Sequence, residues 1–580
     1  MSPRAAPLTG RAIHPPVTRL TIETPGGSIS LFVGGDLLRG VGRRSGRIGA
    51  WIGSRAPIGR LTRRATNSPV KTDIAPPRPS TTRPVALAEL AAATAPAGGR
   101  LIETGADATI TGVTLRAGQV RPGDLFAALP GARAHGADFA ADALAAGAVA
   151  VLTDPAGATR PALGRVPLLV HDEPRRVLGE LSSLIYGDPS SRLSIIGITG
   201  TAGKTTTSYL VEAGLAGTGH TTGLIGTVET RVAGQRLDSA FTTPEAPDLQ
   251  ALLALMVERG VSHVAMEVSS HALTLGRADG TRFAVAAFTN LSQDHLDFHA
   301  DLEDYFGAKA RLFDGRAGTE VVCVDSEWGR RLVGDRTVTV STVDDRATWW
   351  ASDVEVAPSG AQGFEVHGPG GFGYHLVSRL PGSFNVANTL LAVACVHTVG
   401  ADVRAAARAI ATVDVAGRME RVRRGQDFVA IVDYAHKPAA VAAVLDAVRA
   451  QHPRARIAVV LGCGGDRDTA KRPVMGAEAA RRADLLVVTD DNPRSEDPAA
   501  IRGAMLDGAL AVPDGERGEV TEVGDRRAAI RAAVQWARPG DVVVIAGKGH
   551  ETGQEIAGVV HPFVDRDELA AAIDERTGHS

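Results

Sequence analysis

The sequence predicts an α/β protein of three domains, with a doubly wound, mostly parallel sheet in the central domain and a Rossmann-like sheet in the C-terminal one. Strand-length apolar runs alternate with helical stretches, as parallel sheets require. The first set of strand candidates comprises 193–198, 263–268 and 283–289. The second set follows Gly417 and comprises 428–432, 456–461, 485–489 and 541–546. A chain of 580 residues, 44% of them apolar, is long enough for several cores.

The composition excludes several classes of protein. A formal net charge of −3 and an aromatic content of 4% argue against a nucleic-acid partner. The three cysteines, Cys323, Cys395 and Cys463, are too widely spaced for a metal-binding pair and indicate a reduced chain. The sequence has no run of about 18 apolar residues and no signal-peptide pattern at its start, so we expect a cytoplasmic protein without membrane insertion.

The first 84 residues differ from the rest of the chain, because they contain fourteen Lys or Arg against three Asp or Glu. We expect most of the segment 1–84 to be disordered, with one candidate strand at 29–33. A basic arm for nucleic acid or anionic lipid and a misassigned translation start are both left open. The three domains are expected at 85–190, 191–414 and 415–580.

The most informative motif is Ile198-Thr-Gly-Thr-Ala-Gly-Lys-Thr-Thr206, which follows a strand candidate and precedes a helical stretch. Glycines in this position let backbone N–H groups converge on phosphate oxygens at a helix N-terminus. Lys204 would reach the β- and γ-phosphates, and the Thr205 hydroxyl would bind Mg²⁺. Ile198 stands where the strict phosphate-loop pattern has its first glycine. The motif predicts nucleotide binding but leaves the reaction open.

Polar residues follow the neighbouring strand candidates. Glu267 ends an apolar run and is a candidate Mg²⁺ ligand, with a buried acid bonded to loop amides as the alternative. The segment 294–299 contains two Asp and two His, which form either a hard-cation site using one His or a solvated turn. The hydroxyls of 241–244 are expected to cap a helix. Lys309 lies in an amphipathic helix and, from the sequence alone, is expected to be a surface cation.

In this order the motifs resemble those of the Mur ligase family, the ATP-dependent amide-forming enzymes of peptidoglycan precursor synthesis. The resemblance runs from about residue 110 to the C-terminus. Further matching motifs are Met266-Glu-Val-Ser-Ser-His271, Thr289-Asn-Leu-Ser-Gln-Asp-His-Leu-Asp297, Gly382-Ser-Phe-Asn-Val386, Gly417-Arg-Met-Glu420 and Val432-Asp-Tyr-Ala-His436. Within the family, the subgroup that adds meso-diaminopimelate is matched by Gly464-Gly-Asp-Arg-Asp468, Asp491-Asn-Pro-Arg494 and Gly547-Lys-Gly-His-Glu551.

The resemblance implies a set of roles for particular residues. ATP would be bound by Gly200, Thr201, Ala202, Gly203, Lys204, Thr205, Thr206, Asn385, Arg418 and Asp433. Mg²⁺ would be held by Thr205, Glu267, His295 and Lys309, the last as the carbamate (N6-carboxylysine) that CO₂ forms with its amine. The UDP-linked substrate would be bound by the N-terminal domain and by Leu115, Thr242, Thr243, Ser269 and Arg277. The C-terminal domain would bind meso-diaminopimelate through Arg467, Asp491, Asn492, Pro493, Arg494, Gly547 and Glu551.

The chain departs from the family pattern in three places. Arg116-Ala-Gly118 stands where many relatives have Asp-Ser-Arg in the uridine loop, so a side-chain hydroxyl contact is not expected there. The loop Gly131-Ala-Arg-Ala-His-Gly136 offers backbone contacts to a pyrophosphate but assigns no side chain. Ala416 replaces a frequent proline, with little expected chemical effect.

The implied reaction is the ATP-dependent addition of meso-diaminopimelate to UDP-N-acetylmuramoyl-L-alanyl-D-glutamate through an acyl phosphate. Arg494 is the candidate partner of the distal carboxylate of meso-diaminopimelate, because a guanidinium pairs with a carboxylate through two hydrogen bonds. A plain type I turn is the alternative for 491–494. Two rival functions stay open: a related ligase, such as a folylpolyglutamate synthetase or another Mur enzyme, and a phosphate-loop regulatory switch. The oligomeric state is left open, with a monomer as the working expectation.

Overall fold

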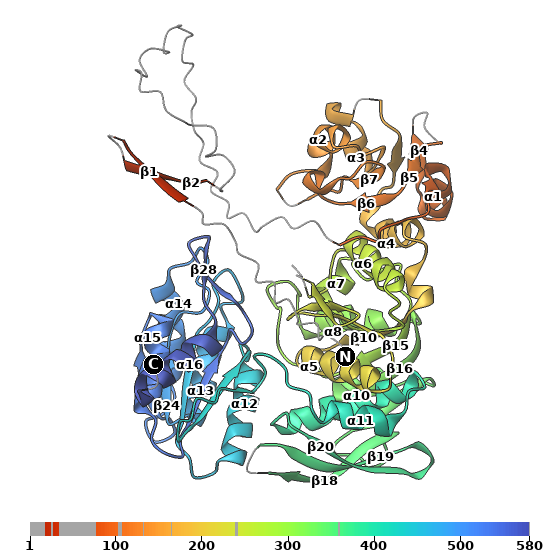
Figure 1. Cartoon of the computed structure of the whole chain (residues 1–580). Coiled ribbons are helices and arrows are strands. Elements are labelled where there is room, and N and C mark those ends of the chain that lie inside the picture. Colours follow the sequence, from red (N-terminus) through yellow and green to blue (C-terminus); the bar gives the residue numbers. More distant parts are fainter. Residues whose placement is uncertain are drawn as a thin grey trace, which may run out of the picture. The chain divides into compact units, whose positions relative to one another are not determined.

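A computed structural model describes residues 77–578, apart from 103–106, 132, 164, 238–241 and 358–359, together with two strands near the N-terminus. The chain forms two compact units, Met1–Asn67 and Ser68–Ser580. In the first unit, β1 (Thr18–Thr24) and β2 (Gly27–Val33) pair antiparallel (Figure 1). The sequence analysis expected one strand at 29–33 and missed its partner. The remainder of 1–76 lies outside the described residues, so the disorder expected there stays a prediction.

The N-terminal domain has a five-stranded sheet in the order β4-β9-β8-β7-β6, in which β6 to β9 are parallel and β4 is antiparallel. Its strands are β4 (Arg100–Ile102), β6 (Gly112–Thr114), β7 (Asp124–Ala127), β8 (Ala150–Thr153) and β9 (Leu168–Val170), beside the small pair β3 (Val85–Ala86) and β5 (Thr109–Ile110). Its helices are α1 (Leu87–Thr94), α2 (Ala140–Ala145), α3 (Pro155–Ala158) and α4 (Pro174–Ile185). Arg78, which lies within the predicted tail, makes a buried bidentate ion pair with Asp124 at 2.7 and 3.0 Å.

The central domain is built on an eleven-stranded sheet in the order β13-β12-β11-β14-β10-β15-β16-β17-β18-β19-β20. The strands from β11 to β18 in this order are parallel, and antiparallel strands extend both edges. The parallel strands are β10 (Ser194–Thr199), β11 (Thr222–Ile225), β14 (His263–Glu267), β15 (Phe283–Phe288), β16 (Ala317–Cys323), β17 (Thr337–Ser341) and β18 (Trp349–Val356). The antiparallel strands are β12 (Thr230–Val232), β13 (Gln235–Leu237), β19 (Gln362–Gly368) and β20 (Phe372–Ser378).

Successive residues of β10 point to opposite faces of this sheet, because side chains alternate along a strand. Ile196 and Ile198 pack in the core beneath α5 (Lys204–Gly217), α10 (Ser383–Thr398) and α11 (Val403–Ile410), which lie together in Figure 1. Ile195 packs in the core beneath α6 (Ala246–Glu258). The shorter helices are α7 (Ser270–Thr274), α8 (Leu302–Ala310) and α9 (Glu327–Arg330).

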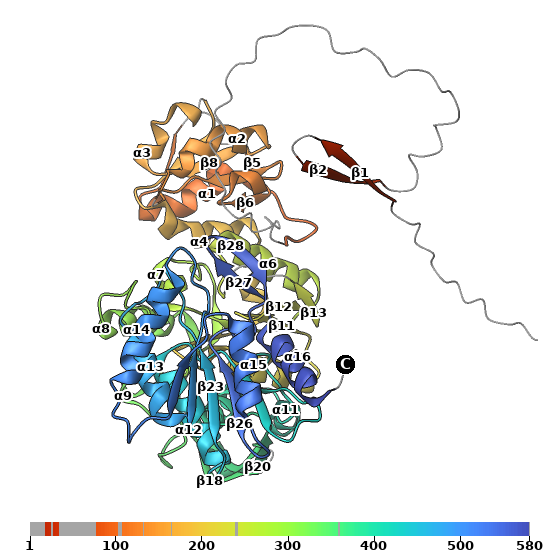
Figure 2. The ribbon, with the colours of Figure 1, turned by 90° about the vertical axis from the view of Figure 1, so that its left-hand side faces the viewer.

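The C-terminal domain has a six-stranded sheet in the order β21-β22-β26-β23-β24-β25, parallel except for β21. Its strands are β21 (Glu420–Arg421), β22 (Val429–Asp433), β23 (Ile457–Leu461), β24 (Leu485–Val488), β25 (Glu519–Glu522) and β26 (Val542–Ala546). One face is covered by α12 (Pro438–Gln451), α13 (Lys471–Arg482) and α14 (Pro498–Leu510), and the other by α15 (Arg526–Trp536) and α16 (Asp565–Thr577) (Figure 2). A hairpin of β27 (Gly553–Ile556) and β28 (Val559–Pro562) follows β26.

The strands predicted in both sets are confirmed, and the strand order brings the predicted site loops together. Because β10 lies between β14 and β15, the loops that follow these three parallel strands leave the sheet at one edge. The phosphate loop and His295 lie in two of these loops, and Glu267 is the last residue of β14. In the C-terminal sheet, Asp433 ends β22, while Asp491 and Gly547 follow β24 and β26, which end at the same edge. The boundaries at 85, 191 and 415 stay predictions. Among the described residues, no helix is long and apolar enough to cross a membrane.

A fully buried ion pair joins the two helices on one face of the C-terminal sheet. Arg526 in α15 donates two hydrogen bonds of 2.7 Å to Asp565 in α16, and neither side chain is exposed. The same guanidinium donates to the carbonyl of Ala546 at the end of β26 (2.9 Å). The guanidinium also donates to Asp490 O (3.4 Å), but Asp565 is the carboxylate that pairs with it, so removing one partner leaves the other charge buried.

We therefore expect Asp565→Asn to lower the free energy of unfolding of the C-terminal domain by about 3–5 kcal/mol. The matched control is Glu575→Gln, which breaks a half-exposed pair between the same two helices and should change stability little. Urea unfolding followed by hydrogen exchange of the β26 amides measures both variants. Equal, small losses in the two variants would contradict the importance of the buried pair.

Candidate functional site

The loop between β10 and α5 has the backbone geometry of a phosphate-binding loop. Gly200 and Gly203 adopt φ values of 146° and 88°, which residues with a side chain rarely adopt. A Cβ atom at Gly200 would lie 1.9 Å from the Thr289 hydroxyl, and one at Gly203 would lie 2.4 Å from Asn388 Oδ1. Both glycines are therefore required. The loop leads directly into α5, which places backbone N–H groups and the positive end of a helix dipole at its mouth.

Three lysines converge on the carbonyls of this loop. Lys204 Nζ donates to Gly200 O (2.9 Å) and Thr201 O (3.2 Å). Lys309, from α8, donates to Gly200 O (2.9 Å) with its side chain almost fully buried. Lys437, which precedes α12, donates to Thr201 O (3.2 Å) and forms an ion pair with Asp294. The ammonium groups thus share backbone acceptors in a place where phosphate oxygens would be stronger ones.

This crowding changes the protonation of the lysines. Burial, together with the charge of Lys437, lowers the pKa of Lys204 to about 8. Burial and the charges of Lys204 and Lys437 lower the pKa of Lys309 well below its ordinary value, so its amine is stabilised in the neutral form. Burial by itself raises the pKa of Asp294, but Lys437 and His295 outweigh that effect and hold it well below its usual range. The surface position expected for Lys309 from its helix alone is therefore wrong.

Lys437 is a site residue that the sequence analysis missed. It follows directly after Val432-Asp-Tyr-Ala-His436, a motif that was recognised, and stands before Pro438 at the start of α12. A lysine before a helix normally lies in solvent. Only the contact between the C-terminal domain and the loop that carries Asp294 places its ammonium beside Thr201.

The predicted metal ligands are only partly assembled. Glu267, buried at the end of β14, accepts hydrogen bonds from Thr205 Oγ1 (3.0 Å) and from Thr227 N (2.7 Å). His295 instead contacts Asp294 (2.9 Å), and its ring lies 4.8 Å from that of His271. Within the described parts of the chain, no group of three or more His, Cys, Asp or Glu is arranged to hold a metal. The hydroxyl–carboxylate pair of Thr205 and Glu267 nevertheless fits Mg²⁺, which binds through one or two carboxylates, water and substrate phosphates.

Of the residues predicted to contact adenine and ribose, Arg418 reaches the phosphate loop directly. Arg418 Nη2 donates to Thr205 Oγ1 (3.2 Å), and its guanidinium lies 4.3 Å from the centre of the Tyr434 ring. Asp433 accepts from the backbone N–H groups of Met419 and Ala435, both at 2.7 Å. Burial raises the pKa of Asp433, against the opposing effect of Arg418.

Asn385, in the first turn of α10, is buried and donates to Pro381 O (2.7 Å). It also accepts a hydrogen bond from Asn388 (3.0 Å), the residue against which Gly203 packs. Asn385 is thereby linked to the phosphate loop through one intervening side chain.

Four of the five residues predicted for the UDP-linked substrate form one network beside Glu267. Thr243 Oγ1 donates to Glu267 O (2.9 Å) and accepts from Ser269 N (3.2 Å). Arg277 donates to Thr243 O (3.4 Å), and the hydroxyl of Thr242 lies 3.0 Å from that of Thr227. Ser269 also caps α7, as its hydroxyl accepts from Ala272 N (3.1 Å).

The fifth residue, Leu115, is not part of this network. It follows β6 and packs against the core of the N-terminal domain.

The predicted amino-acid pocket lies within the C-terminal domain. Asn492 Nδ2 donates to Glu551 Oε2 (2.8 Å), and a Cβ atom at Gly547 would lie 2.7 Å from Asp491 Oδ2. Arg494 adopts φ = 54°, a left-handed conformation that is strained for this residue type.

The hairpin and the neighbouring loop hold Arg494 in this conformation. Its N–H donates to Glu555 O (3.0 Å), and its guanidinium contacts the carbonyl of Gly465. Pro493 accepts a hydrogen bond from Glu496 N (3.1 Å) in the same turn. Arg467 is exposed and donates to its neighbour's carbonyl, Asp466 O (3.3 Å), so it lies at the rim.

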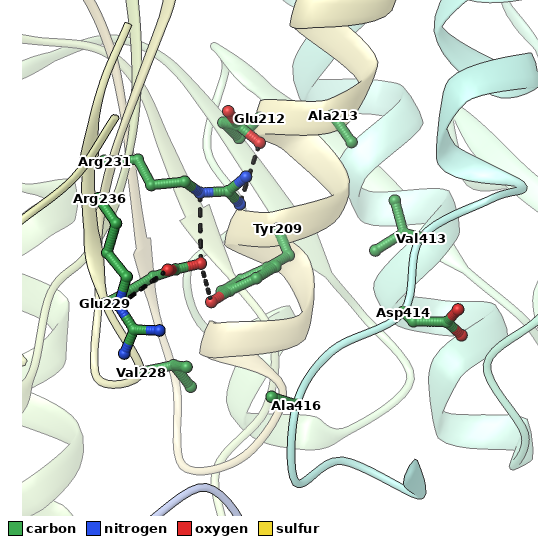
Figure 3. Close-up of a pocket in the computed structure, with 10 residues that line it drawn as sticks. All are labelled: Tyr209, Glu212, Ala213, Val228, Glu229, Arg231, Arg236, Val413, Asp414 and Ala416. Carbon is green, nitrogen blue, oxygen red and sulfur yellow. Dashed lines mark hydrogen bonds and ion pairs between the residues drawn. The ribbon is translucent and has the colours of Figure 1, made fainter. Parts of the chain in front are cut away.

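A cavity of about 410 Å³ lies beside the segment that links the central and C-terminal domains (Figure 3). It is bounded by α5, by the strands β12 and β13 and by 413–416. Arg231 pairs with Glu212 (3.2 Å) and Glu229 (3.4 Å), and the Tyr209 hydroxyl donates to Glu229 (2.7 Å). None of the lining residues belongs to the predicted site. Its two arginines, Arg231 and Arg236, pair with its glutamates, whereas the contacts of Lys204 and Lys309 at the phosphate loop are to backbone carbonyls.

Comparison with known proteins identifies the family to which the chain belongs. Three profiles match successive parts of the chain: "Mur ligase family, catalytic domain" over residues 109–186, "Mur ligase middle domain" over 198–396, and "Mur ligase, glutamate ligase domain" over 417–549. The chain belongs to the Mur ligase family. The family resemblance and the α/β architecture inferred from the sequence are thus confirmed.

Individual proteins with names that state a reaction are also similar to this chain. The chain is 55% identical over 512 residues to the UDP-N-acetylmuramoyl-L-alanyl-D-glutamate--2,6-diaminopimelate ligase of Streptomyces coelicolor, an alignment covering 87% of this chain and 99% of that protein. It is also 55% identical over 462 residues to the ligase of the same name from Corynebacterium glutamicum, covering 78% and 89%. A solved structure of a ligase with this name has 31% identity and a TM-score of 0.60, covering 85% of this chain and 100% of that one. MurF from Acinetobacter baumannii, 18% identical with a TM-score of 0.59, shares the fold.

We expect Lys437→Met to weaken binding of Mg²⁺·ATP at least tenfold, because it removes a charge-assisted contact worth about 1.5–3 kcal/mol beside the predicted phosphate site. The matched control is Lys471→Met, which removes a nearby lysine that bonds to His436 O instead (3.1 Å). Isothermal titration calorimetry measures both. Equal affinities for the wild-type protein and Lys437→Met would remove Lys437 from the nucleotide site.

Proposed function

We propose that the protein is an ATP-dependent ligase that joins meso-diaminopimelate to the γ-carboxylate of D-glutamate in UDP-N-acetylmuramoyl-L-alanyl-D-glutamate. The observation that carries the proposal is the convergence of Lys204, Lys309 and Lys437 on the phosphate loop, at the sheet edge where the predicted nucleotide and acceptor residues meet. Such a site favours anionic ligands over neutral ones. The 55% identity to ligases of this name, over nearly their whole length, supports the choice of reaction.

The γ-carboxylate of the acceptor has a poor leaving group, so it must be activated before an amine can attack it. Transfer of the γ-phosphoryl group of ATP to the acceptor's γ-carboxylate gives an acyl phosphate and ADP. The amine of meso-diaminopimelate then attacks the acyl carbon, the C–O bond to phosphate breaks, and the nitrogen loses a proton. ATP and the acceptor are both anionic, so cations must hold them together. Lys204, Lys437 and Arg418 supply that charge, and no side-chain nucleophile is needed.

The proposed Mg²⁺ ligands are Thr205 and Glu267, already in contact, with His295 and Lys309 completing the predicted set. When bound, Mg²⁺ would neutralise the β- and γ-phosphate oxygens. Thr227 N and the Thr205 hydroxyl orient the Glu267 carboxylate in its buried position. The protein's own contribution is therefore a fixed carboxylate at the edge of the phosphate loop.

We propose further that Lys309 carries a carbamate. Its amine is held neutral by burial and by the neighbouring ammonium groups, and only a neutral amine attacks CO₂. The nitrogen bonds to the carbon of CO₂ and releases one proton, which leaves an anion on Lys309. That anion would lie among Lys204 and Lys437, where a negative charge is favourable.

The proposed partners are ATP, the UDP-linked dipeptide and meso-diaminopimelate. The acceptor is assigned to Leu115 and the Thr243 network, and the amino acid to 491–494, Gly547, Glu551 and the rim residue Arg467. Arg494 is proposed to pair with a carboxylate of meso-diaminopimelate and Glu551 with an ammonium. The proposal places the reaction in the cytoplasm, where ATP and nucleotide-linked precursors are found, and a monomer contains every residue it uses.

The direct test combines purified protein with UDP-N-acetylmuramoyl-L-alanyl-D-glutamate, ATP, Mg²⁺ and either meso-diaminopimelate or L-lysine. We expect mass spectrometry to show a tripeptide product with meso-diaminopimelate, formed in step with ADP. A preference for L-lysine would overturn the amino-acid assignment. ADP release that requires neither acceptor nor amine would favour the regulatory switch instead.

Arg494→Ala should lower kcat/KM for meso-diaminopimelate by about 10²-fold, because a charge-assisted contact of about 2–3 kcal/mol is lost. Arg482→Ala serves as the control, since its guanidinium pairs with Asp446 and Glu478 on the helical face and touches no predicted ligand residue. Steady-state kinetics with varied meso-diaminopimelate measures both. An unchanged kcat/KM in Arg494→Ala would reject its role.

Lys309→Ala should abolish most ligation, and short-chain carboxylic acids should restore part of it by replacing the missing carbamate. Lys204→Ala is the matched control: it should be equally inactive but gain nothing from the acids, because it lacks a cation. The coupled assay of ADP release reports both variants. Full activity of Lys309→Ala without any additive would exclude the carbamate from the mechanism.

A further inference from the structure

A fully buried lysine lies directly behind the predicted amino-acid pocket. Lys548 follows β26, and its side chain has no exposed surface. It is flanked by Gly547 and Gly549, with φ values of 114° and 54°. A Cβ atom at Gly549 would lie 2.7 Å from Tyr434 Cβ, so only a glycine lets the chain turn there. The two glycines direct a long cationic side chain into the interior, where lysines are almost never found unpaired.

The ammonium of Lys548 contacts three of the residues predicted to bind the amino acid. It donates to Asn492 Oδ1 (3.0 Å) and to Glu551 Oε2 (3.0 Å), and it lies 3.7 Å from Asp491 Oδ1. Asn492 Oδ1 also accepts from Glu555 N (3.0 Å). The lysine therefore links the loop after β24 to the loop after β26.

An ammonium group has three donors and no acceptor, so the atom of Asn492 that faces it must be the carbonyl oxygen. The amide nitrogen of Asn492 is thereby turned away from Lys548, and one of its hydrogens is donated to Glu551 Oε2 (2.8 Å). One amide hydrogen remains for a ligand. Glu551 Oε2 accepts two hydrogen bonds, from Asn492 and Lys548, which leaves Oε1 as the acceptor available to a ligand.

We propose that Lys548 is the positioning residue that makes this pocket selective for an amino-acid centre. Together with Glu555 N it holds the carbonyl oxygen of Asn492, so that the amide N–H groups suit a carboxylate, and by donating to Glu551 Oε2 it leaves Oε1 to accept from an ammonium. This inference rests on the proposed function and specifies how the pocket recognises meso-diaminopimelate, whose distal centre carries both groups. L-lysine has an ammonium at its distal end but no carboxylate, and so gains less from the arrangement.

The test compares Lys548→Met, which keeps the length of the side chain but loses its donors, with the wild-type protein. We expect the KM for meso-diaminopimelate to rise at least tenfold, while the KM for ATP changes less than twofold. The preference for meso-diaminopimelate over L-lysine should fall by a similar factor. Arg456→Met is the control, because it breaks an ion pair with Asp541, before the opposite end of β26, and should leave both KM values unchanged.

A double variant shows whether Lys548 acts through Asn492. In an Asn492→Ala background, adding Lys548→Met should raise the KM for meso-diaminopimelate less than threefold, because the amide to be oriented is already gone. If the two losses simply multiply, Lys548 does not work by orienting that amide and the inference is overturned.

The folding and the KM of the Lys548 variants also test the inference. A folded Lys548→Met with a wild-type KM for meso-diaminopimelate overturns the inference. If Lys548→Met is insoluble, Lys548→Gln is measured in its place, and the insolubility of both would assign Lys548 to folding alone and overturn it too. A wild-type protein that does not ligate meso-diaminopimelate refutes the proposed function itself, whereas wild-type ligation with an unshifted variant refutes only the role of Lys548.

Discussion

The crowding of buried ammonium groups against the phosphate loop is the constraint on which the site depends. Three lysines share the carbonyls of Gly200 and Thr201, with Asp294 as the carboxylate that pairs with one of them. Like charges held this close in a buried place raise the free energy of the empty site. The arrangement is relieved in two ways that the proposed reaction uses: Lys309 gives up its proton, and anionic phosphates replace the backbone carbonyls as acceptors.

The fold places these cations without any one segment containing them. Lys204 enters with the helix after β10, Lys309 with α8 beyond β15, and Lys437 with the helix after β22 of a different sheet. Strand order makes this convergence possible, since β10 lies between β14 and β15 in the central sheet. The same principle builds the proposed amino-acid pocket, where loops after β24 and β26 meet around Lys548.

Much of the fold and of the candidate site could be predicted from the sequence, because the features that indicate them are local. The strands, the phosphate loop and the position of Glu267 at a strand end follow from apolar runs and turn residues that are adjacent in the chain. The antiparallel strands β19 and β20 were missed, although apolar Phe364 and Val366 alternate with polar Glu365 and His367 in β19, a signal that could have found it. Three features were not predictable, since each depends on a contact between distant segments. They are the burial of Lys309, the hydrogen bond from Lys437 to Thr201 and the ion pair between Arg78 and Asp124.

The central claim is that phosphate leaves as part of an acyl phosphate formed on the acceptor. The most direct measurement uses UDP-N-acetylmuramoyl-L-alanyl-D-glutamate carrying ¹⁸O in both oxygens of its γ-carboxylate, with unlabelled ATP and meso-diaminopimelate. Mass spectrometry of the released inorganic phosphate should show one ¹⁸O atom per molecule, in proportion to the tripeptide formed. Tripeptide accompanied by unlabelled phosphate would contradict the account.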